Sequence, residues 1–578
     1  MMKIYRNIVF CFTWLCLPVT IGFSSLVNAN ESFDALIEEI WEYESNLREV
    51  KPADISPQAL SKQHQRYSSF LEKTQQYQPA ELSQEQKITL LMQQYRLNNY
   101  IDQHKFESFK VPLTSEYGFH SALATLPNAT RFSTLKDYRD YLTQLKRIKG
   151  YIQQNIAYMQ QGLEQGYTQP KAVLKDYEAS VTPFLVDKAQ DSVFYTPFKT
   201  LPSFISKEQA QKLRNQAKAI ISSDIVSAYK QYHDFLVDHY IPQARESIAA
   251  SDWPNGEAYY NNRIKHYTTT DMNAQQVHDL GLNEVKRIRN AMQKIVDELD
   301  FDGDIDAFIR FLRTDPQFYA KTPEALLKQA SFIAKRADAS LPALFEKLPR
   351  TPYGVAPVPE DIAPKYTTGR YIHAANETEP GYYWVNTYAL DKRPLYALPA
   401  LTLHEAVPGH HLQISLAKEM SDLPAVRQNT YISAFGEGWG LYSEFLGIEA
   451  GIYQTPYDHF GRLSYEMWRA CRLVVDTGMH MFGWTRQQAI DYMMKNTALS
   501  EHNIKTEIDR YISWPAQALS YKIGEIKIKA LRQKAEQALG EQFDVREFHT
   551  AVLAHGSVPL FVLEQNINAF IKNKQTGK

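Results

Sequence analysis

The segment Leu403–Gln413 (Leu-His-Glu-Ala-Val-Pro-Gly-His-His-Leu-Gln) constrains the fold more than any other part of the chain. His404, Glu405, His410 and His411 bring three imidazoles and one carboxylate into eight residues. Catalytic zinc sites use these groups as ligands and bases. The usual form is His-Glu-x-x-His on one helix, where both histidines share a face and the glutamate acts as general base.

The second histidine comes two residues later than in that form. On an unbroken helix each residue turns about 100°, so His404 and His410 would lie about 240° apart. Pro408 has no N–H and Gly409 tolerates unusual dihedrals. We therefore predict a helical bulge that returns His410 to the face of His404 and leaves His411 outside the metal site. An ordinary polar patch after a Pro-Gly helix break is the alternative.

A third zinc ligand has to come from elsewhere in the fold, with one position left open for water. Glu437 lies 27 residues after His410, which leaves room for a connection and a second helix. Glu444, seven residues further, shares the helix face of Glu437 and is either the rival ligand or a partner of a ligating histidine. Small residues around Glu437 favour close approach of another element, whereas two solvated carboxylates are the alternative.

The groups that could stabilise an oxyanion are less sharply indicated. Tyr511 and Tyr521 flank a segment that contains a proline, and a phenol can donate to the oxyanion of a tetrahedral intermediate. Arg472, Asp476 and His480 recur at intervals of four residues on one predicted helix. This stripe is either a solvated, salt-bridged face or a set of cleft residues, and the sequence leaves both open.

Apolar spacing in the rest of the chain predicts a mainly α protein. Apolar residues recur at helical intervals in residues 33–47, 138–159, 206–250 and 274–297. The 578 residues include only 24 glycines, and 44% are hydrophobic, which suits a large helical body. We expect the helix over 274–297 to begin at a cap within Thr268–Asp271.

The domain boundary is expected at a proline-rich connector. Residues 348–368 would separate a helical region at 30–347 from a catalytic region at 369–572. A single domain over about 30–572 is the alternative.

Two β-rich segments follow the connector. Gly369–Ala374 and Tyr382–Tyr388 are separated by turn residues at Asn376–Gly381, so we predict a small β-hairpin sheet beside the metal-binding helix. An extended peptide could add to its strand edge and be held over the metal. A simple surface hairpin is the alternative.

Residues 1–29 have the features of a cleavable secretory signal. Lys3 and Arg6 precede an apolar run from Ile8 to Phe23, and Val27–Ala29 resembles a cleavage site. Polar residues interrupt the run, which matches poorly the ~20 apolar residues of a transmembrane helix. We therefore expect a periplasmic or secreted protein with no stable membrane insertion after signal cleavage.

Charge and cysteine content indicate which partners and which covalent links to expect. The formal net charge is −2, which gives no reason to expect a nucleic-acid partner. No lipid-attachment pattern precedes Cys11 or Cys16, and Cys471 is the one cysteine outside the predicted signal, so we expect no internal disulfide. The sequence does not indicate an oligomeric state.

Residues from Tyr382 to about Ile567 resemble the bacterial family called domain of unknown function 885. Its hallmark His-Glu-x-x-Pro-Gly-His-x-x-Gln is met by His404, Glu405, Pro408, Gly409, His410 and Gln413. Gly436–Trp439, Val474–Gly478 and Gln517–Tyr521 also resemble that family. The resemblance implies a metallopeptidase with the site logic of helical gluzincins, which use His-Glu-x-x-His and a downstream Glu in a helical body with a deep cleft.

Together these observations predict zinc-dependent hydrolysis of peptide bonds in short or unfolded peptides. The predicted zinc ligands are His404, His410 and Glu437. The predicted general base is Glu405, and Tyr521 or, less favoured, His480 or Tyr511 would stabilise the oxyanion. The alternatives are a zinc hydrolase acting on a non-peptide amide or ester, and a non-catalytic peptide-binding protein.

Overall fold

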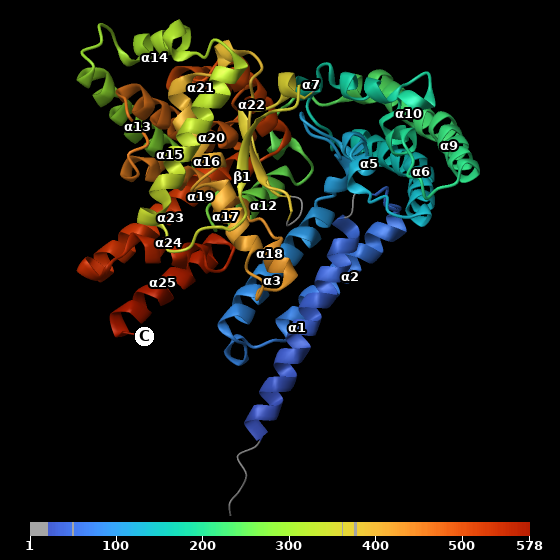
Figure 1. The fold of residues 1–578 in the computed structure, drawn as a ribbon, viewed down its shortest axis with the longest axis horizontal. Helices are drawn as coiled ribbons and strands as arrows, with labels where there is room; N and C mark the ends of the chain where they lie inside the picture. The colour runs from blue at the N-terminus through green and yellow to red at the C-terminus, as the bar shows by residue number, and fades with distance from the viewer. Residues whose placement is uncertain (1–20, 49–50, 361, 375–377, 578) are drawn as a thin grey trace, which may run out of the picture.

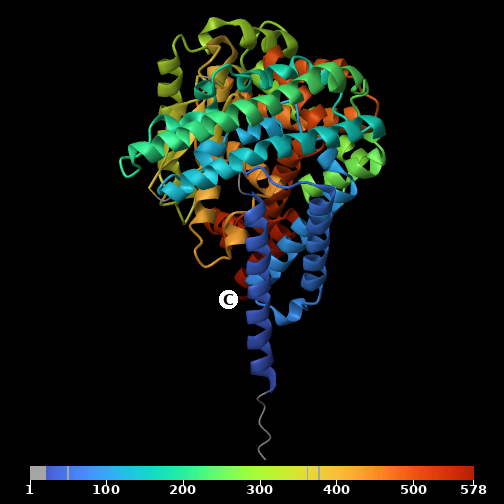
Figure 2. The same ribbon diagram turned by 90° about the vertical axis from the view of Figure 1, so that its right-hand side faces the viewer.

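The structure of the protein is a computed structural model that describes residues 21–48, 51–360, 362–374 and 378–577. Three helices project from the body of the molecule in both ribbon views (Figure 1, Figure 2): α1 (Ile21–Arg48), α2 (Pro57–Gln75) and α3 (Gln84–Lys105). The helix predicted over 33–47 is thus confirmed. Most of the predicted signal segment lies outside the described residues, and residues 21–29 begin α1.

The apolar repeat in residues 138–159 forms the inner face of α6 (Leu135–Gln165). The Thr134 hydroxyl accepts a hydrogen bond from the Asp137 N–H and starts the helix, and Gly166 with φ 86° ends it. The predicted helical stretch at 206–250 forms α9 (Lys207–Ile220) and α10 (Val226–Phe235) with π-helical turns at Ile221–Ile225 and Leu236–Tyr240. Figure 2 shows these helices crossing the molecule side by side with α6.

Residues 256–577 form a larger helical body. Its long helices are α12 (Gly256–Thr268), α13 (Ala274–Glu298), α15 (Pro323–Leu344), α19 (Ser433–Glu449), α20 (Pro456–Met481), α22 (Glu501–Ser513), α23 (Ser520–Leu539) and α25 (Leu560–Thr576). The shorter ones include α14 (Ile305–Thr314), α21 (Arg486–Asn496) and α24 (Val545–Leu553). The predicted helix at 274–297 is α13, but its cap is Asn273, whose side chain accepts from the Gln276 N–H. The expected cap at Thr268–Asp271 was wrong because Thr268 still belongs to α12.

One hydrophobic core unites segments from both sides of the predicted connector. It runs from Ile88 in α3 to Ile571 in α25. α13 packs so closely on α20 that a Cβ at Gly281 would lie 2.7 Å from the Leu473 Cβ. Helices from the N-terminal region therefore support α20 directly. Within the described ranges, none of the helices combines the length and apolar character needed to cross a membrane.

The sheet is small and has three strands, β1 (Tyr353–Pro357), β2 (Gly369–Ile372) and β3 (Gly381–Val385), in the order β1-β3-β2. β2 and β3 pair antiparallel, which confirms the predicted hairpin, although residues 375–377 of its turn lie outside the described part. The predicted connector supplies β1, which pairs parallel to β3 and which the sequence analysis did not predict. β2 is therefore an edge strand. The fold is mainly α with a small sheet, as predicted.

Candidate metal centre and its cavity

The metal-binding motif lies on two short helices rather than on one bulged helix. α16 (Leu398–Glu405) ends immediately after His404, and α17 (His410–Lys418) begins at His410. The four linking residues include a cis Val407–Pro408 peptide bond. The Gly409 N–H donates to the Leu403 carbonyl oxygen at 3.0 Å. A Cβ at residue 409 would lie only 1.9 Å from the His404 carbonyl oxygen, so this close approach requires glycine.

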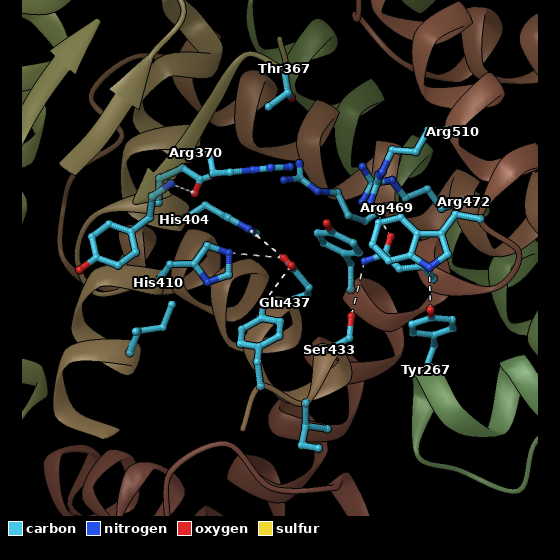
Figure 3. Close-up of a pocket in the computed structure, with 18 of the residues that line it drawn as sticks. Tyr267, Thr367, Arg370, His404, His410, Ser433, Glu437, Arg469, Arg472 and Arg510 are labelled. Atoms are coloured by element: carbon cyan, nitrogen blue, oxygen red, sulfur yellow. Dashed lines mark hydrogen bonds and ion pairs between the residues drawn. The ribbon is translucent and has the colours of Figure 1, made fainter. Parts of the chain in front are cut away.

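The broken helix brings the three predicted ligands together (Figure 3). Oε2 of Glu437 lies 3.5 Å from Nε2 of His404 and 3.4 Å from Nε2 of His410. All three ligand atoms lie within 4.8 Å of one another. Two atoms that each lie about 2.0–2.1 Å from one tetrahedral zinc ion are about 3.3–3.4 Å apart. Both distances from Glu437 to the histidines therefore match the spacing of two zinc ligands, and the three side chains form a group that could hold a metal ion.

Three glycines of α19 let neighbouring groups approach Glu437. A Cβ at Gly440 would lie 2.6 Å from Cε1 of His404, and one at Gly438 would lie 2.5 Å from the Cα of Gly524 in α23. A Cβ at Gly436 would overlap the Tyr431 ring. The expectation of close packing around Glu437 is thereby confirmed.

Glu444 orients His404 from behind. Its Oε1 lies 2.9 Å from Nδ1 of His404 and 3.2 Å from a guanidinium nitrogen of Arg469. A carboxylate on one ring nitrogen fixes the tautomer and turns the other nitrogen toward a metal. Of the two roles considered for Glu444, the structure favours the supporting one.

The electrostatics of the cluster favour a cation among these groups. Burial disfavours protonation of His404, but hydrogen bonds to Glu437 and Glu444 outweigh it and raise the pKa of His404 to about 9. Burial likewise disfavours the Glu437 carboxylate, yet the charge of His410 and the hydrogen bonds from both histidines hold its pKa well below the ordinary value. A metal cation can take the place of the protons that these rings would otherwise hold.

Glu405 faces the same cavity and is oriented by the sheet. Its Oε2 accepts a hydrogen bond from the Tyr371 N–H of β2 at 2.7 Å. Oε1 has no hydrogen-bond partner within the described part of the chain. Glu405 thus presents one oxygen to the space beside His404, as a general base requires.

The cavity has a volume of about 700 Å³. The metal centre supplies His404, Glu405, His410 and Glu437 to its lining, and β2, α3, α12, α20 and α22 supply other walls. This confirms that the helical body encloses a cleft at the predicted motif.

The remaining predicted residues lie in different places. Tyr521 lines the cavity, and its ring centroid lies 6.4 Å from that of His404. His480 does not reach the cavity. Its Nδ1 accepts from the Ala250 N–H and its Nε2 donates to the Tyr511 carbonyl oxygen, both at 3.0 Å. Burial lowers the pKa of His480 to about 4. The catalytic role predicted for His480 is therefore corrected to a structural one.

Two other candidates are also engaged elsewhere. The Tyr511 hydroxyl donates to Glu507 and accepts from Arg472 and Trp468, at 2.7–2.9 Å. The Nδ1 of His411 lies 2.9 Å from the Tyr371 hydroxyl, and burial lowers the pKa of His411 to about 4. His411 is outside the three-ligand group, as predicted.

The sequence analysis did not predict that the Tyr431 hydroxyl and several arginine side chains lie at the site. The Tyr431 hydroxyl donates to Oε1 of Glu437 at 2.9 Å. Arg370, Arg469 and Arg510 line the cavity together with Arg472. Of these four, only Arg472 was a candidate cleft residue in the sequence analysis. No local periodicity distinguishes Tyr431, because it precedes α19 in an irregular segment.

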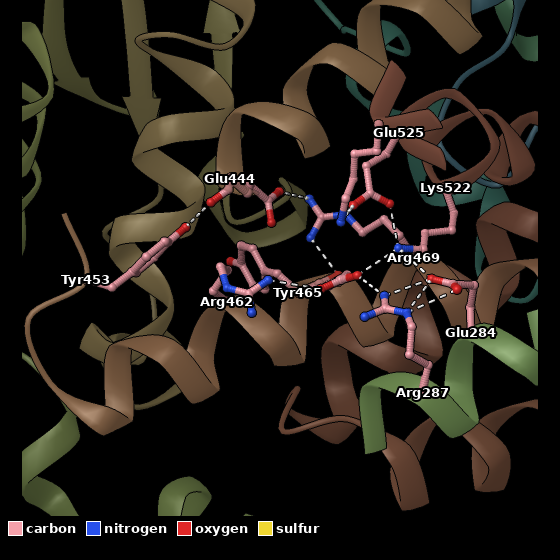
Figure 4. Close-up of polar contacts among 11 residues, drawn as sticks. Glu284, Arg287, Glu444, Tyr453, Arg462, Tyr465, Arg469, Lys522 and Glu525 are labelled. Carbon is pink, nitrogen blue, oxygen red and sulfur yellow. Dashed lines mark hydrogen bonds and ion pairs between the residues drawn. The ribbon is translucent and has the colours of Figure 1, made fainter. Parts of the chain in front are cut away.

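A buried ionic network lies behind this wall (Figure 4). Lys522 of α23 forms ion pairs with Glu466, Glu525 and Glu284 at 2.9, 2.5 and 3.1 Å. Removing one partner of a buried pair leaves an uncompensated charge and costs about 3–5 kcal/mol. The network thereby holds α13, α20 and α23 in fixed relative positions. α20 supplies Tyr465, Trp468, Arg469 and Arg472 to the cavity lining, and α23 supplies Tyr521.

Known proteins share this fold over nearly its whole length. A structure titled "putative lipoprotein" from Colwellia psychrerythraea is 27% identical with a TM-score of 0.83, covering 94% of this chain and 99% of that chain. A "putative lipoprotein of unknown function" from Shewanella oneidensis is 19% identical with a TM-score of 0.72 and the same coverage, which shows the fold alone. No protein with a curated description matches the chain.

The family model described as "Bacterial protein of unknown function (DUF885)" matches residues 44–567. This match covers most of the 578 residues and includes the metal centre, α19, α20 and α23. The chain therefore belongs to the DUF885 family of bacterial proteins.

Proposed function

We propose that the protein is a zinc-dependent hydrolase that cleaves peptide bonds in short or unfolded peptides. The observation that carries this proposal is the convergence of His404, His410 and Glu437 on one point, with Glu405 facing the same cavity. Two imidazoles and one carboxylate form a donor set of catalytic zinc sites, and the open side of the cluster leaves a position for water.

A bound zinc ion would lower the pKa of a water molecule and polarise the scissile carbonyl. Glu405 removes a proton from the attacking water while the water oxygen bonds to the carbonyl carbon. The same carboxyl group then gives that proton to the amine nitrogen as the C–N bond breaks. The Tyr371 N–H keeps Glu405 turned toward this point. Tyr521, which lines the cavity beside His404, is the proposed donor to the oxyanion.

The walls of the cavity suit an extended peptide. β2 is an edge strand of the sheet, and Gly369, Arg370 and Tyr371 line the cavity. An edge strand can pair with an extended chain through backbone hydrogen bonds. A metal recessed in a cavity of about 700 Å³ excludes folded proteins, so short or flexible peptides are the proposed substrates.

A mixed peptide library tests the proposed reaction. The zinc-loaded protein is incubated with the library, with and without a chelator, and the products are identified by mass spectrometry. New peptide termini that appear only in the zinc-loaded sample are expected. Cleavage of added amide or ester model compounds without peptide cleavage would favour a non-peptide hydrolase. A purified protein that binds peptides but takes up no stoichiometric metal would favour a non-catalytic binding protein.

We also propose that the protein acts outside the cytoplasm. Residues 1–29 have the features of a secretory signal, and the two solved structures named above are each titled "putative lipoprotein". N-terminal mass spectrometry of protein from the native host is expected to show Asn30 as the first residue. A lipid-modified terminus at Cys11 or Cys16 would contradict cleavage after Ala29, and an intact Met1 in the cytoplasm would contradict export.

A further inference from the structure

The cavity carries more arginine than its carboxylates neutralise. Within the described part of the chain, its charged lining residues are Arg96, Glu116, Arg370, Glu405, Glu437, Arg469, Arg472, Glu507 and Arg510. Arg96 pairs with Glu44, and Arg469 pairs with Glu444, outside that lining. Glu405 and Glu437 belong to the metal centre.

Three arginines therefore remain against two carboxylates. Arg370, Arg472 and Arg510 face the cavity with Glu116 and Glu507, which leaves one positive charge on this wall. Figure 3 shows Arg472 and Arg510 across the cavity from His410, with the side chain of Arg370 running toward them.

Arg472 has an N–H group with no partner. Its guanidinium carbon lies 4.4 Å from the Trp468 ring centroid and 4.3 Å from that of Tyr521, so the group is held over both rings. Its Nε donates to the Tyr511 hydroxyl and its Nη2 to Glu507. Nη1 is buried without a hydrogen-bond partner among the described residues. Leaving a charged donor unsatisfied is costly, so this nitrogen marks a position for an acceptor.

The other two guanidiniums approach from different elements. Arg510 of α22 shares the Glu507 carboxylate with Arg472, at 3.2 Å. Arg370 lies on β2, one residue before the Tyr371 N–H that orients Glu405. Planar guanidiniums match the planar geometry of a carboxylate and bind it with two parallel hydrogen bonds. The wall is thus built to accept a carboxylate.

The wall around Arg472 is buried. Arg472 is 2% exposed, and Tyr511, which it contacts outside the cavity lining, is 1% exposed. A peptide that reaches Arg472 meets buried side chains there, which suits a chain terminus. The positive charge of the wall would repel an N-terminal ammonium group.

We infer that Arg370, Arg472 and Arg510 bind the C-terminal carboxylate of the peptide, so that the protein cleaves near the C-terminal end of its substrates. This inference rests on the proposed hydrolysis. The amine leaving group is then the short C-terminal fragment, which receives its proton from Glu405 while the arginines hold its carboxylate.

Matched peptides test the inference in two ways. One peptide has a free C-terminal carboxylate, a second is its C-terminal amide, and a third is the amide with an internal Glu near that end. Cleavage is followed by mass spectrometry with the zinc-loaded protein. Binding is measured by calorimetry with the Glu405→Gln protein, both zinc-loaded and chelated, which separates recognition from turnover.

Hydrogen bonds to a charged group contribute enough for about 10- to 100-fold discrimination. The free acid is expected to bind and to be cleaved at least about tenfold better than either amide, with release of C-terminal fragments. Equal binding of all three peptides would overturn the inference. A preference for the internal Glu over the free acid would also overturn it, by assigning the arginines to a side chain.

Substitution of the exposed arginine avoids a folding defect. Arg370→Gln, an exposed position, is expected to reduce the preference for the free acid over the amide about tenfold. Arg350→Gln, an 87% exposed side chain outside the cavity, is the matched control and should keep the full preference. If the wild-type protein cleaves acid and amide equally, the proposed hydrolysis stands and this inference fails. If the free acid binds selectively but nothing is cleaved, the carboxylate site stands and the proposed hydrolysis fails.

Discussion

Nδ1 of His404 lies 2.9 Å from Oε1 of Glu444, so the Nε2 of the same ring is turned toward His410 and Glu437. Glu444 lies in α19, seven residues after Glu437 and two turns along the same helix. One helix therefore supplies both a candidate ligand and the group that orients another ligand. The Glu444 carboxylate is itself held by Arg469 at 3.2 Å, so its position does not depend on a metal.

Loss of the Glu444 charge should weaken metal binding without abolishing it. Glu444→Gln keeps the size of the side chain but not the charged acceptor for the His404 Nδ1–H. We expect zinc affinity to fall about 10- to 100-fold, measured by competition with a chromophoric chelator. Glu449→Gln, at the last residue of α19, is the control. Unchanged affinity in Glu444→Gln would contradict the supporting role.

Removal of a candidate zinc ligand should lower zinc binding more than Glu444→Gln does. His404→Ala, His410→Ala and Glu437→Ala are each expected to lose most bound zinc, measured by elemental analysis of protein dialysed against trace zinc. His411→Ala should keep its zinc, since that ring contacts the Tyr371 hydroxyl instead. Zinc retained in His410→Ala but lost in His411→Ala would exchange the two roles.

Turnover should depend on Glu405 independently of metal binding. Glu405→Gln retains an acceptor for the Tyr371 N–H but cannot take a proton from water. We expect peptide hydrolysis to fall about 10²- to 10⁴-fold while bound zinc stays stoichiometric. A variant with normal zinc content and undiminished kcat would remove Glu405 from the reaction.

Two glycine-to-alanine substitutions should differ in their effect on zinc affinity. Gly440 is inside α19, where a Cβ would lie 2.6 Å from the His404 ring, so Gly440→Ala should displace that ring and lower zinc affinity. Gly150 lies inside α6, and a Cβ there has nothing within 4 Å. Gly150→Ala should raise stability by about 0.5–1 kcal/mol with no change in zinc affinity. Thermal unfolding and chelator competition measure the two effects, and equal zinc affinity in both variants would refute the packing argument.

Asp476 should make stability depend on pH. Burial raises its pKa to about 7 in the folded protein, although hydrogen bonds from the Tyr260 hydroxyl and the Ala516 N–H oppose the shift. The unfolded state has a pKa near 3.9. Because the folded state binds the Asp476 proton more tightly than the unfolded state does, protonation of Asp476 adds to the free energy of unfolding. This contribution is complete below about pH 4 and is lost as the pH rises through about 7.

The Asp476→Asn variant tests that dependence. The amide keeps one oxygen for Tyr260 and Ala516 but carries no charge to bury. We expect it to be more stable than wild type at pH 8, by up to about 4 kcal/mol, and to lose this advantage at pH 4. Denaturant unfolding at both pH values measures the difference. An advantage of equal size at pH 4 and pH 8 would show that ionisation of Asp476 is not its cause.

The sequence by itself determined the helices and singled out the candidate metal-binding motif. The apolar period of α6 and the turn residues between β2 and β3 act over a few neighbouring residues, so they can be recognised without the fold. The spacing of His404 and His410 required an interruption of the helix. Packing around Gly409 decided that the helix would break completely rather than bulge.

Only the tertiary structure decided which polar side chains share the cavity. His480 and Arg472 occupy the same predicted stripe of α20, yet His480 bonds to two backbone groups whereas Arg472 lines the cavity. The packing of α19 against α16 likewise decides that Glu437 faces Nε2 of His404 and that Glu444 bonds to its Nδ1. Each of these outcomes depends on elements distant in sequence, and no local pattern records which surface of a helix another helix will cover.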